Sequence, residues 1–229
     1  MLFRSPGVTV DRKEGIARVD GTDVGVVDLP GTYSITAYTA EEIAARDFLV
    51  NERPGAVVDV LDAGTLERSL YLAVQFQEMG APLVLALNMM DEVRARGMEI
   101  DSALLSEIMG APVVETVAKR GEGREEVLRQ ALRVARESGG RVTPLRISYS
   151  PDIDAALDRM EALINGDEFL TRRLPARWTA LKYLEEDVQV IAMGRAEGAL
   201  SADLEAIAAE LKDHCEKTLK TSPEAVIAD

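Results

Sequence analysis

Short apolar runs rich in β-branched residues alternate with amphipathic helical stretches through the first 140 residues of the chain. The apolar runs are residues 56–61, 83–88 and 112–117. Runs of this length and composition are typical of strands that are buried on both faces of a sheet. The helical stretches are residues 66–79, 102–109 and 123–138. This alternation of strand and helix predicts an α/β domain with a largely parallel sheet and helices on both faces.

An antiparallel pair of strands is expected ahead of these units. Residues 15–19 and 24–28 are apolar runs separated by Asp20-Gly21 and two further residues. An Asp-Gly pair favours the tight turn of a hairpin, because both residues tolerate a positive φ. The second run ends at Asp28, which begins the first of the motifs discussed below.

The character of the sequence changes after Gly140, and no strand-like run follows Pro151. Pro151, Pro175 and Pro223 stand at or near predicted helix starts, where proline is tolerated. The predicted helices are residues 152–163, 167–173, 176–187, 201–219 and 223–228. We therefore expect two domains, an α/β domain over residues 1–146 and an all-α domain over residues 147–229.

Composition excludes several classes of function. Acidic residues outnumber basic residues 40 to 26, which gives a net charge of −14, and aromatic residues make up 4% of the chain. Both features argue against nucleic acid as a partner. The single cysteine, Cys215, rules out an internal disulfide and fits a reducing compartment. No apolar run approaches the ~18 residues of a membrane span, and no leader peptide is evident.

The first of three motifs is Asp28-Leu29-Pro30-Gly31, directly after a predicted strand. In open α/β sheets, ligands bind at the carboxyl ends of the strands. Asp-x-x-Gly at such a position is how nucleotide-hydrolysing switch proteins place a carboxylate near Mg²⁺ and a glycine amide near the terminal phosphate. The alternative is a plain Pro-Gly turn that follows a strand.

The second motif is Asn88-Met89-Met90-Asp91, which also follows a predicted strand. An aspartate carboxylate offers two acceptors, which match the N1–H and N2–H₂ donors of guanine. Adenine does not present donors in that arrangement, so the motif favours a guanine site, with Asn88 bridging the base and the neighbouring loops. In the alternative interpretation, Asn88 ends a strand and Asp91 caps the next helix.

The third motif is Thr116-Val117-Ala118, a loop of small residues after the last predicted strand. Backbone amides of such a loop can contact a base, although an ordinary strand-to-helix loop has the same appearance. Upstream, Pro6-Gly7-Val8-Thr9-Val10 is a candidate switch segment whose threonine hydroxyl can bind Mg²⁺, with Val8, Thr9 and Val10 near the nucleotide; the alternative is a β-branched strand start. The order of the motifs and their positions at strand ends together indicate a guanine-nucleotide domain.

Several segments resemble the bacterial ferrous iron transport protein B family. They are residues 6–15 (PGVTVDRKEG), 26–34 (VVDLPGTYS), 66–72 (LERSLYL), 87–91 (LNMMD) and 177–185 (RWTALKYLE). The resemblance runs from about Pro6 to Asp229 and implies a Ras-like P-loop GTPase fold followed by a helical domain that stabilises bound GDP. It implies GTP or GDP and Mg²⁺ as ligands, with K⁺ as a further candidate.

The resemblance also assigns roles to residues and partners to the chain. Thr9 and Asp28 fall at the Mg²⁺ positions, Asn88 and Asp91 at the guanine-reading positions, and 116–118 at the base-contacting loop. Glu41 and Glu42 allow two interpretations, as residues that position water or K⁺, or as first-turn acids of a helix capped by Thr39. In the family, these two domains lie at the cytoplasmic face of the bacterial inner membrane and precede a membrane permease domain for Fe²⁺. The resemblance is also compatible with an oligomer.

The sequence departs from the family pattern at one place. The family has a strand and the phosphate-binding pattern G-x-x-x-x-G-K-[ST] before the first switch, whereas here the first switch begins at residue 6 and the dipeptide Gly-Lys does not occur. We therefore expect a Ras-like fold without its first strand and P-loop. Two functions stay open: a GTPase module that regulates Fe²⁺ uptake, or a degenerate, non-catalytic interaction module that keeps the fold without productive nucleotide binding.

Overall fold

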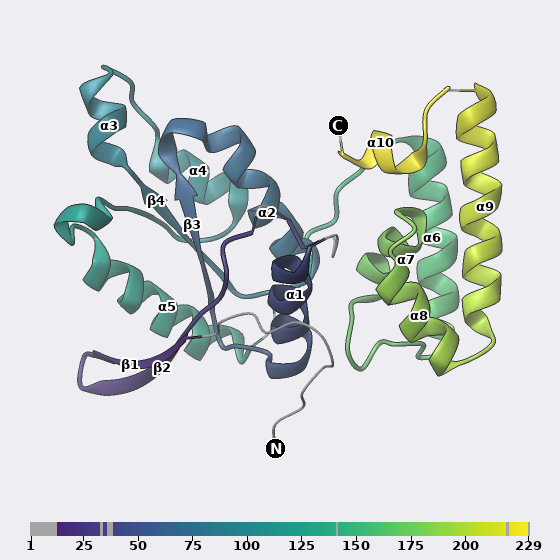
Figure 1. Cartoon of the computed structure of the whole chain (residues 1–229), viewed down its shortest axis with the longest axis horizontal. Coiled ribbons are helices and arrows are strands. Elements are labelled where there is room, and N and C mark those ends of the chain that lie inside the picture. The colour runs from purple at the N-terminus through teal and green to yellow at the C-terminus, as the bar shows by residue number, and fades with distance from the viewer. Residues whose placement is uncertain (1–12, 33, 36–38, 141, 219, 229) are drawn as a thin grey trace. The chain divides into compact units, whose positions relative to one another are not determined.

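The computed structural model describes residues 13–32, 34–35, 39–140, 142–218 and 220–228, and the chain divides into two compact units (Figure 1). The first unit is Met1–Thr143 and the second is Pro144–Asp229. None of the helices in the described part of the chain combines the length and the apolar character needed to span a bilayer.

The first unit begins with the predicted hairpin. Strands β1 (Lys13–Val19) and β2 (Thr22–Asp28) pair in antiparallel register, from Lys13 opposite Asp28 to Val19 opposite Thr22. Asp20 and Gly21 form the turn with φ values of 47° and 78°. Two positive φ values are those of a type I′ turn, whose twist matches the strands it joins, so the prediction from Asp-Gly is confirmed.

The three predicted parallel strands form one sheet with the order β3-β4-β5. Their bounds are β3 (Val57–Asp62), β4 (Leu83–Asn88) and β5 (Val113–Glu115). The central strand β4 is buried from Leu83 to Leu87, so both of its faces are covered. Asp62 lies opposite Asn88, and Leu87 lies opposite Glu115. The carboxyl ends of the three strands therefore meet at one edge of the sheet, where the second and third motifs lie.

The three predicted helices of this unit, at residues 66–79, 102–109 and 123–138, are present as α2, α4 and α5, together with two further helices. They are α1 (Ala40–Glu52), α2 (Leu66–Glu78), α3 (Met90–Ala95), α4 (Ser102–Met109) and α5 (Arg124–Ser138), with 3₁₀ turns η1 (Ala63–Thr65) and η2 (Ala118–Arg120). The Asp101 carboxylate accepts the Leu104 N–H at 2.9 Å and caps α4, and Gly110 ends that helix in the left-handed conformation. Both signals were readable in the sequence.

The sheet of the first unit is in two parts. Within the described residues, no strand pairs with both β2 and β3, so the β1–β2 hairpin stands apart from the three-stranded sheet and β3 is an edge strand. Val58 and Val60 of β3 are 37% and 63% exposed, and Ile16 of β1 is 80% exposed. The predicted parallel sheet is confirmed; among the described residues it consists of β3, β4 and β5, and the hairpin forms a second sheet.

The second unit is all-helical, as predicted. It contains α6 (Pro151–Gly166), α7 (Ala176–Leu184), α8 (Val188–Glu197), α9 (Leu200–Thr218) and α10 (Pro223–Ala228). The Ser150 hydroxyl accepts the Ile153 N–H, and Pro151 is the first residue of α6, a position where a missing N–H costs nothing. Trp178 and Tyr183 of α7 are nearly inaccessible and form the centre of the core.

Two details of the predicted helices are wrong. Residues 167–173 form turns rather than a helix, because Glu168 and Leu170 adopt φ values of 52° and 56°, which a right-handed helix cannot include. Helix α8 was not predicted, and the stretch 176–187 ends as helix at Leu184. The Asp187 carboxylate accepts the N–H groups of Gln189 and Val190 and caps α8, so this helix had a readable start signal.

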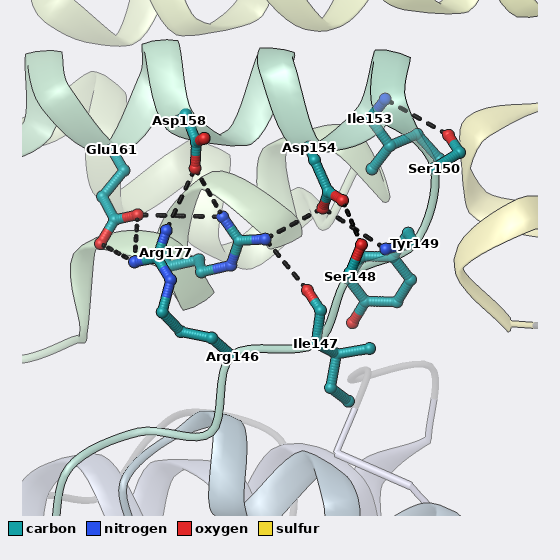
Figure 2. Close-up of polar contacts among 10 residues, drawn as sticks. All are labelled: Arg146, Ile147, Ser148, Tyr149, Ser150, Ile153, Asp154, Asp158, Glu161 and Arg177. Carbon is teal, nitrogen blue, oxygen red and sulfur yellow. Dashed lines mark hydrogen bonds and ion pairs between the residues drawn. The ribbon is translucent and has the colours of Figure 1, made fainter.

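A cluster of ion pairs fixes the segment that leads into α6 (Figure 2). Arg177, whose side chain is 14% exposed, donates to the Ile147 carbonyl at 3.0 Å, to Asp154 at 3.1 Å and to Asp158 at 3.0 Å. Arg146 pairs with Asp158 and Glu161, which both lie on α6. The Ser148 hydroxyl also donates to Asp154, and this bond, with help from Arg177, holds the pKa of Asp154 below its usual value.

Candidate nucleotide-binding site

Asn88, the last residue of β4, joins the second and third motifs. Its Oδ1 accepts the Ala118 N–H at 3.0 Å and the Thr116 hydroxyl at 3.4 Å. Backbone bonds support the same junction, because the Thr116 N–H donates to the Leu87 carbonyl at 2.8 Å and the Met90 N–H donates to the Thr116 carbonyl at 3.4 Å. Asn88 therefore ends a strand, as the alternative interpretation of the second motif predicted. It also fixes the loop 116–118 to that strand end.

The loop after Thr116 is closed on itself. Val117 and Glu122 exchange two backbone hydrogen bonds of 3.2 and 3.3 Å around the η2 turn, and Val117 is 3% exposed. Gly123 has a φ of +80°, and a Cβ at this position would lie 2.4 Å from the Glu115 carbonyl oxygen and 2.9 Å from Thr116 Cγ2. Only glycine fits this close approach, which holds the start of α5 against the loop.

Asp91 lies in the first turn of α3, beside this loop. The N-cap of α3 is Met89, with a φ of 64°, and no side chain caps the helix. The alternative in which Asp91 caps that helix is therefore wrong. The Asp91 side chain is 29% exposed, and its Oδ2 lies 3.7 Å from the guanidinium of Arg120. The structure thus gathers Asn88, Asp91 and residues 116–118 around one strand end, with the Asp91 carboxylate partly exposed.

The first motif follows β2 of the hairpin, outside the three-stranded sheet that carries the second and third motifs. Asp28 ends β2 and is followed by Leu29, Pro30 and Gly31 outside any regular element. No hydrogen bond or ion pair between described residues joins Asp28 to Asn88, Asp91 or Thr116. A Cβ at Gly31 would meet no atom within 4 Å, so packing does not require glycine there. Val8, Thr9 and Val10 lie outside the described residues.

The segment after Gly31 is held by residues that the motifs do not include. The Ile35 N–H donates to Gln75 Oε1 of α2 at 2.8 Å, in a buried contact. The Ser34 hydroxyl donates to Glu42, which also accepts the Thr39 N–H while the Thr39 hydroxyl accepts the Glu42 N–H. Glu42 is thus the first-turn acid of a capping box, which confirms that interpretation for this residue. The Gln75 contact had no signal in the sequence, because it joins residues 40 positions apart.

Candidate metal ligands lie in both units of the described chain. No group of three or more His, Cys, Asp or Glu side chains in the described ranges is arranged to hold a metal ion. His214 pairs with Asp152 at 3.5 Å, and the neighbouring Cys215 is buried and free. Of the two residues predicted to bind Mg²⁺, Asp28 is described and presents an oxygen donor of the type that Mg²⁺ prefers.

Family models match both units. A model for Ferrous iron transport protein B matches residues 4–131, and a model for the FeoB cytosolic helical domain matches residues 149–229. An Fe(2+) transport protein A/Fe(2+) transporter FeoB fusion protein of Porphyromonas gingivalis is 40% identical over 185 residues, covering 80% of this chain and 22% of that protein. The Fe(2+) transporter FeoB of Escherichia coli K12 is 34% identical over 211 residues, covering 90% and 26%. The chain thus spans about a quarter of the length of these relatives.

Solved structures agree with this assignment. A mutant of S. thermophilus NFeoB bound to GDP has a TM-score of 0.84 and 31% identity, with 98% of this chain and 83% of that chain covered. The cytosolic domain of the T. maritima FeoB iron transporter in a GDP form has a TM-score of 0.77 and 28% identity, with 93% and 87% covered. The chain described here belongs to the ferrous iron transport protein B family, and its two units have the Ras-like α/β fold of the family's G domain and the fold of its cytosolic helical domain.

Proposed function

We propose that this chain is a guanine-nucleotide-binding module of a ferrous iron transporter and that its first unit reads the base. The observation that carries the proposal is the bond from the Ala118 N–H to Asn88 Oδ1, since it sets the small-residue loop beside the Asp91 carboxylate. Guanine presents N1–H and N2–H₂ to such a carboxylate, and adenine leaves one of its oxygens unpaired. The related S. thermophilus structure is described as bound to GDP, which supports the same ligand here.

The phosphate end of the nucleotide belongs to the first motif in this proposal. Asp28 would approach Mg²⁺ together with the Thr9 hydroxyl, and the backbone of residues 29–31 would lie beside the terminal phosphate. When bound, the metal neutralises charge on the phosphates. A K⁺ ion is a further proposed ligand.

The larger role follows from family membership and is likewise proposed. The module would hydrolyse GTP and regulate Fe²⁺ uptake through a membrane permease domain, at the cytoplasmic face of the inner membrane. The second unit would stabilise bound GDP. Homo-oligomers are compatible with this role.

A second candidate is a non-catalytic interaction module that retains the fold. The observation behind it is that no hydrogen bond or ion pair between described residues joins Asp28, on the proposed phosphate side, to Asn88 or Asp91, on the proposed base side. This candidate predicts that guanine nucleotides bind no better than adenine nucleotides.

Titration of the chain with fluorescent GDP and fluorescent ADP separates the two candidates. The proposal predicts saturable, Mg²⁺-dependent binding of GDP and at least about tenfold weaker binding of ADP, because the wrong base leaves the carboxylate unpaired. Asn88→Ala should weaken GDP binding, since it releases the Ala118 amide. Equal binding of the two nucleotides, or no binding of either, would overturn the proposal and favour the second candidate.

A further inference from the structure

Arg120 forms an ion pair with Asp91, the residue that the proposed function assigns to the guanine base. Its guanidinium lies 3.7 Å from Asp91 Oδ2 on one side and 3.7 Å from Glu122 Oε1 on the other. Asp91 is the residue assigned above to the base, so its carboxylate already has a cationic partner in the ligand-free structure. None of the sequence motifs includes Arg120.

The chemistry of the two partners is alike. A guanidinium is a planar N–C–N group that directs parallel N–H donors at a carboxylate. The N1–H and N2–H₂ edge of guanine is the same planar N–C–N arrangement, with the same pair of parallel donors. In the ligand-free structure the guanidinium lies near one oxygen of Asp91, at an ion-pair distance of 3.7 Å. A base that donates to both oxygens would compete with Arg120 for this carboxylate.

The loop holds the backbone of Arg120 in place and leaves its side chain free to move. The two backbone bonds between Val117 and Glu122 and the bond from Ala118 to Asn88 fix the turn on which Arg120 lies. The Arg120 side chain is 63% exposed. An ion pair this exposed costs little to open, so the contact adjusts affinity without closing the site.

We propose that Arg120 is an internal mimic of guanine that occupies the Asp91 carboxylate in the empty site and must be displaced when the nucleotide binds. This proposal rests on the function proposed above. It assigns Arg120 an autoinhibitory role, in which the Arg120 side chain competes with the guanine base for the Asp91 carboxylate and so lowers the affinity for the nucleotide. Glu122 supplies the alternative partner that receives Arg120 when the base enters.

The test compares Arg120→Ala with a matched variant, Arg96→Ala. Arg96 pairs with Glu92 on the same short helix as Asp91, at 3.8 Å, and is 60% exposed, so both variants remove one exposed cation near the site. Fluorescent GDP is titrated into the full chain and both variants at constant ionic strength. We expect Arg120→Ala to bind about two- to fivefold tighter than the parent, as loss of an exposed competing ion pair implies, and Arg96→Ala to match the parent.

The same comparison in the Asp91→Asn background tests the mechanism. Without the carboxylate there is nothing for Arg120 to occupy, so adding Arg120→Ala should leave the affinity for fluorescent xanthosine diphosphate unchanged. Tighter GDP binding by Arg120→Ala alone, including binding seen only in that variant, supports the proposal. If the parent binds GDP and the affinity of Arg120→Ala for GDP is equal or lower, the proposal that Arg120 mimics guanine is wrong and the proposed function stands. If no variant binds any nucleotide, the proposed function fails and the mimic fails with it.

Discussion

The backbone at Gly123 approaches its neighbours more closely than a residue with a side chain allows. Gly123→Ala would place a Cβ 2.4 Å from the Glu115 carbonyl oxygen, with a φ of +80°. We expect this substitution to lower the free energy of unfolding of the first unit by about 2–4 kcal/mol, since it combines a clash with backbone strain. Urea unfolding followed by circular dichroism measures the loss.

Gly121 provides the control for that substitution. It has a similar φ of +72° in the same loop, but a Cβ there would meet no atom within 4 Å. Gly121→Ala should therefore cost only the strain of the left-handed conformation, about 1 kcal/mol. Equal losses for the two variants would show that the close approach at Gly123 has no energetic consequence.

Asp59 makes the stability of the first unit depend on pH. It is a buried residue of β3 that is 7% exposed, its Oδ2 has no hydrogen-bond partner, and burial raises its pKa to about 7. Between the unfolded pKa near 4 and the folded pKa, the folded state keeps a proton that the unfolded state has lost. Stability is therefore expected to fall as pH rises through this window and to level off above it, by up to about 4 kcal/mol.

Asp59→Asn removes this titration and isolates its effect. Urea unfolding at pH 5 and pH 8 should show the variant gaining stability relative to the parent at the higher pH, because no charge has to be buried. If parent and variant lose stability in parallel between the two pH values, Asp59 ionises as freely in the folded protein as in the unfolded chain.

Residues of the proposed site differed in how far the sequence could predict their positions. The proximity of Asn88, Asp91 and the loop 116–118 was predictable because each follows a strand end, and parallel strands bring their carboxyl ends together. Gln75 and Arg120 were not, since their partners depend on tertiary packing that leaves no local pattern. Thr39 and Glu42 did follow a local pattern, three residues apart, which explains why the capping box was readable.

At the scale of elements, Arg177 fastens the segment before α6 to two helices. Its nearly buried guanidinium contacts the Ile147 carbonyl, Asp154 and Asp158 (Figure 2). We expect Arg177→Ala to destabilise the second unit by about 1.5–3 kcal/mol, the usual range for hydrogen bonds to a charged group, because Ile147, Asp154 and Asp158 lose a largely buried donor. Urea unfolding measures the change, and hydrogen exchange should show lost protection at residues 147–150.

Arg146 is the matched comparison, since it pairs with the same carboxylates but is 58% exposed. Arg146→Ala should cost about 0–1 kcal/mol, the usual range for an exposed ion pair. Similar losses in the two variants would mean that burial does not distinguish the two arginines.

Elements with capping and turn signals were predictable, and elements shaped by packing were not. The type I′ turn at Asp20-Gly21 and the caps at Asp101 and Ser150 follow from local chemistry. Residues 167–173 form turns where a helix was predicted. Glu168 and Leu170 adopt positive φ values there, and Phe169 and Leu170 are buried, a combination for which the sequence carries no local signal.

At the scale of the whole molecule, the two units divide the chain into an α/β part and a helical part, and the site lies within the first. The family assignment covers both units, while the chain spans about a quarter of the length of its relatives. Transport, hydrolysis and regulation belong to the proposed function of the larger protein. The proposed base site lies among described residues, where Asn88 Oδ1 joins its strand end to the loop 116–118.

The ratio of the affinities of Asp91→Asn for guanosine and xanthosine diphosphates tests the base assignment most directly. Replacing the carboxylate by an amide exchanges an acceptor for a donor, which suits the additional carbonyl of xanthine. Glu92→Gln, one residue further along α3, controls for the lost charge. The account predicts that Asp91→Asn loses about 10²-fold or more in GDP affinity, binds xanthosine diphosphate better than GDP, and that Glu92→Gln keeps the parent's preference. An unchanged preference for guanine in Asp91→Asn would contradict it.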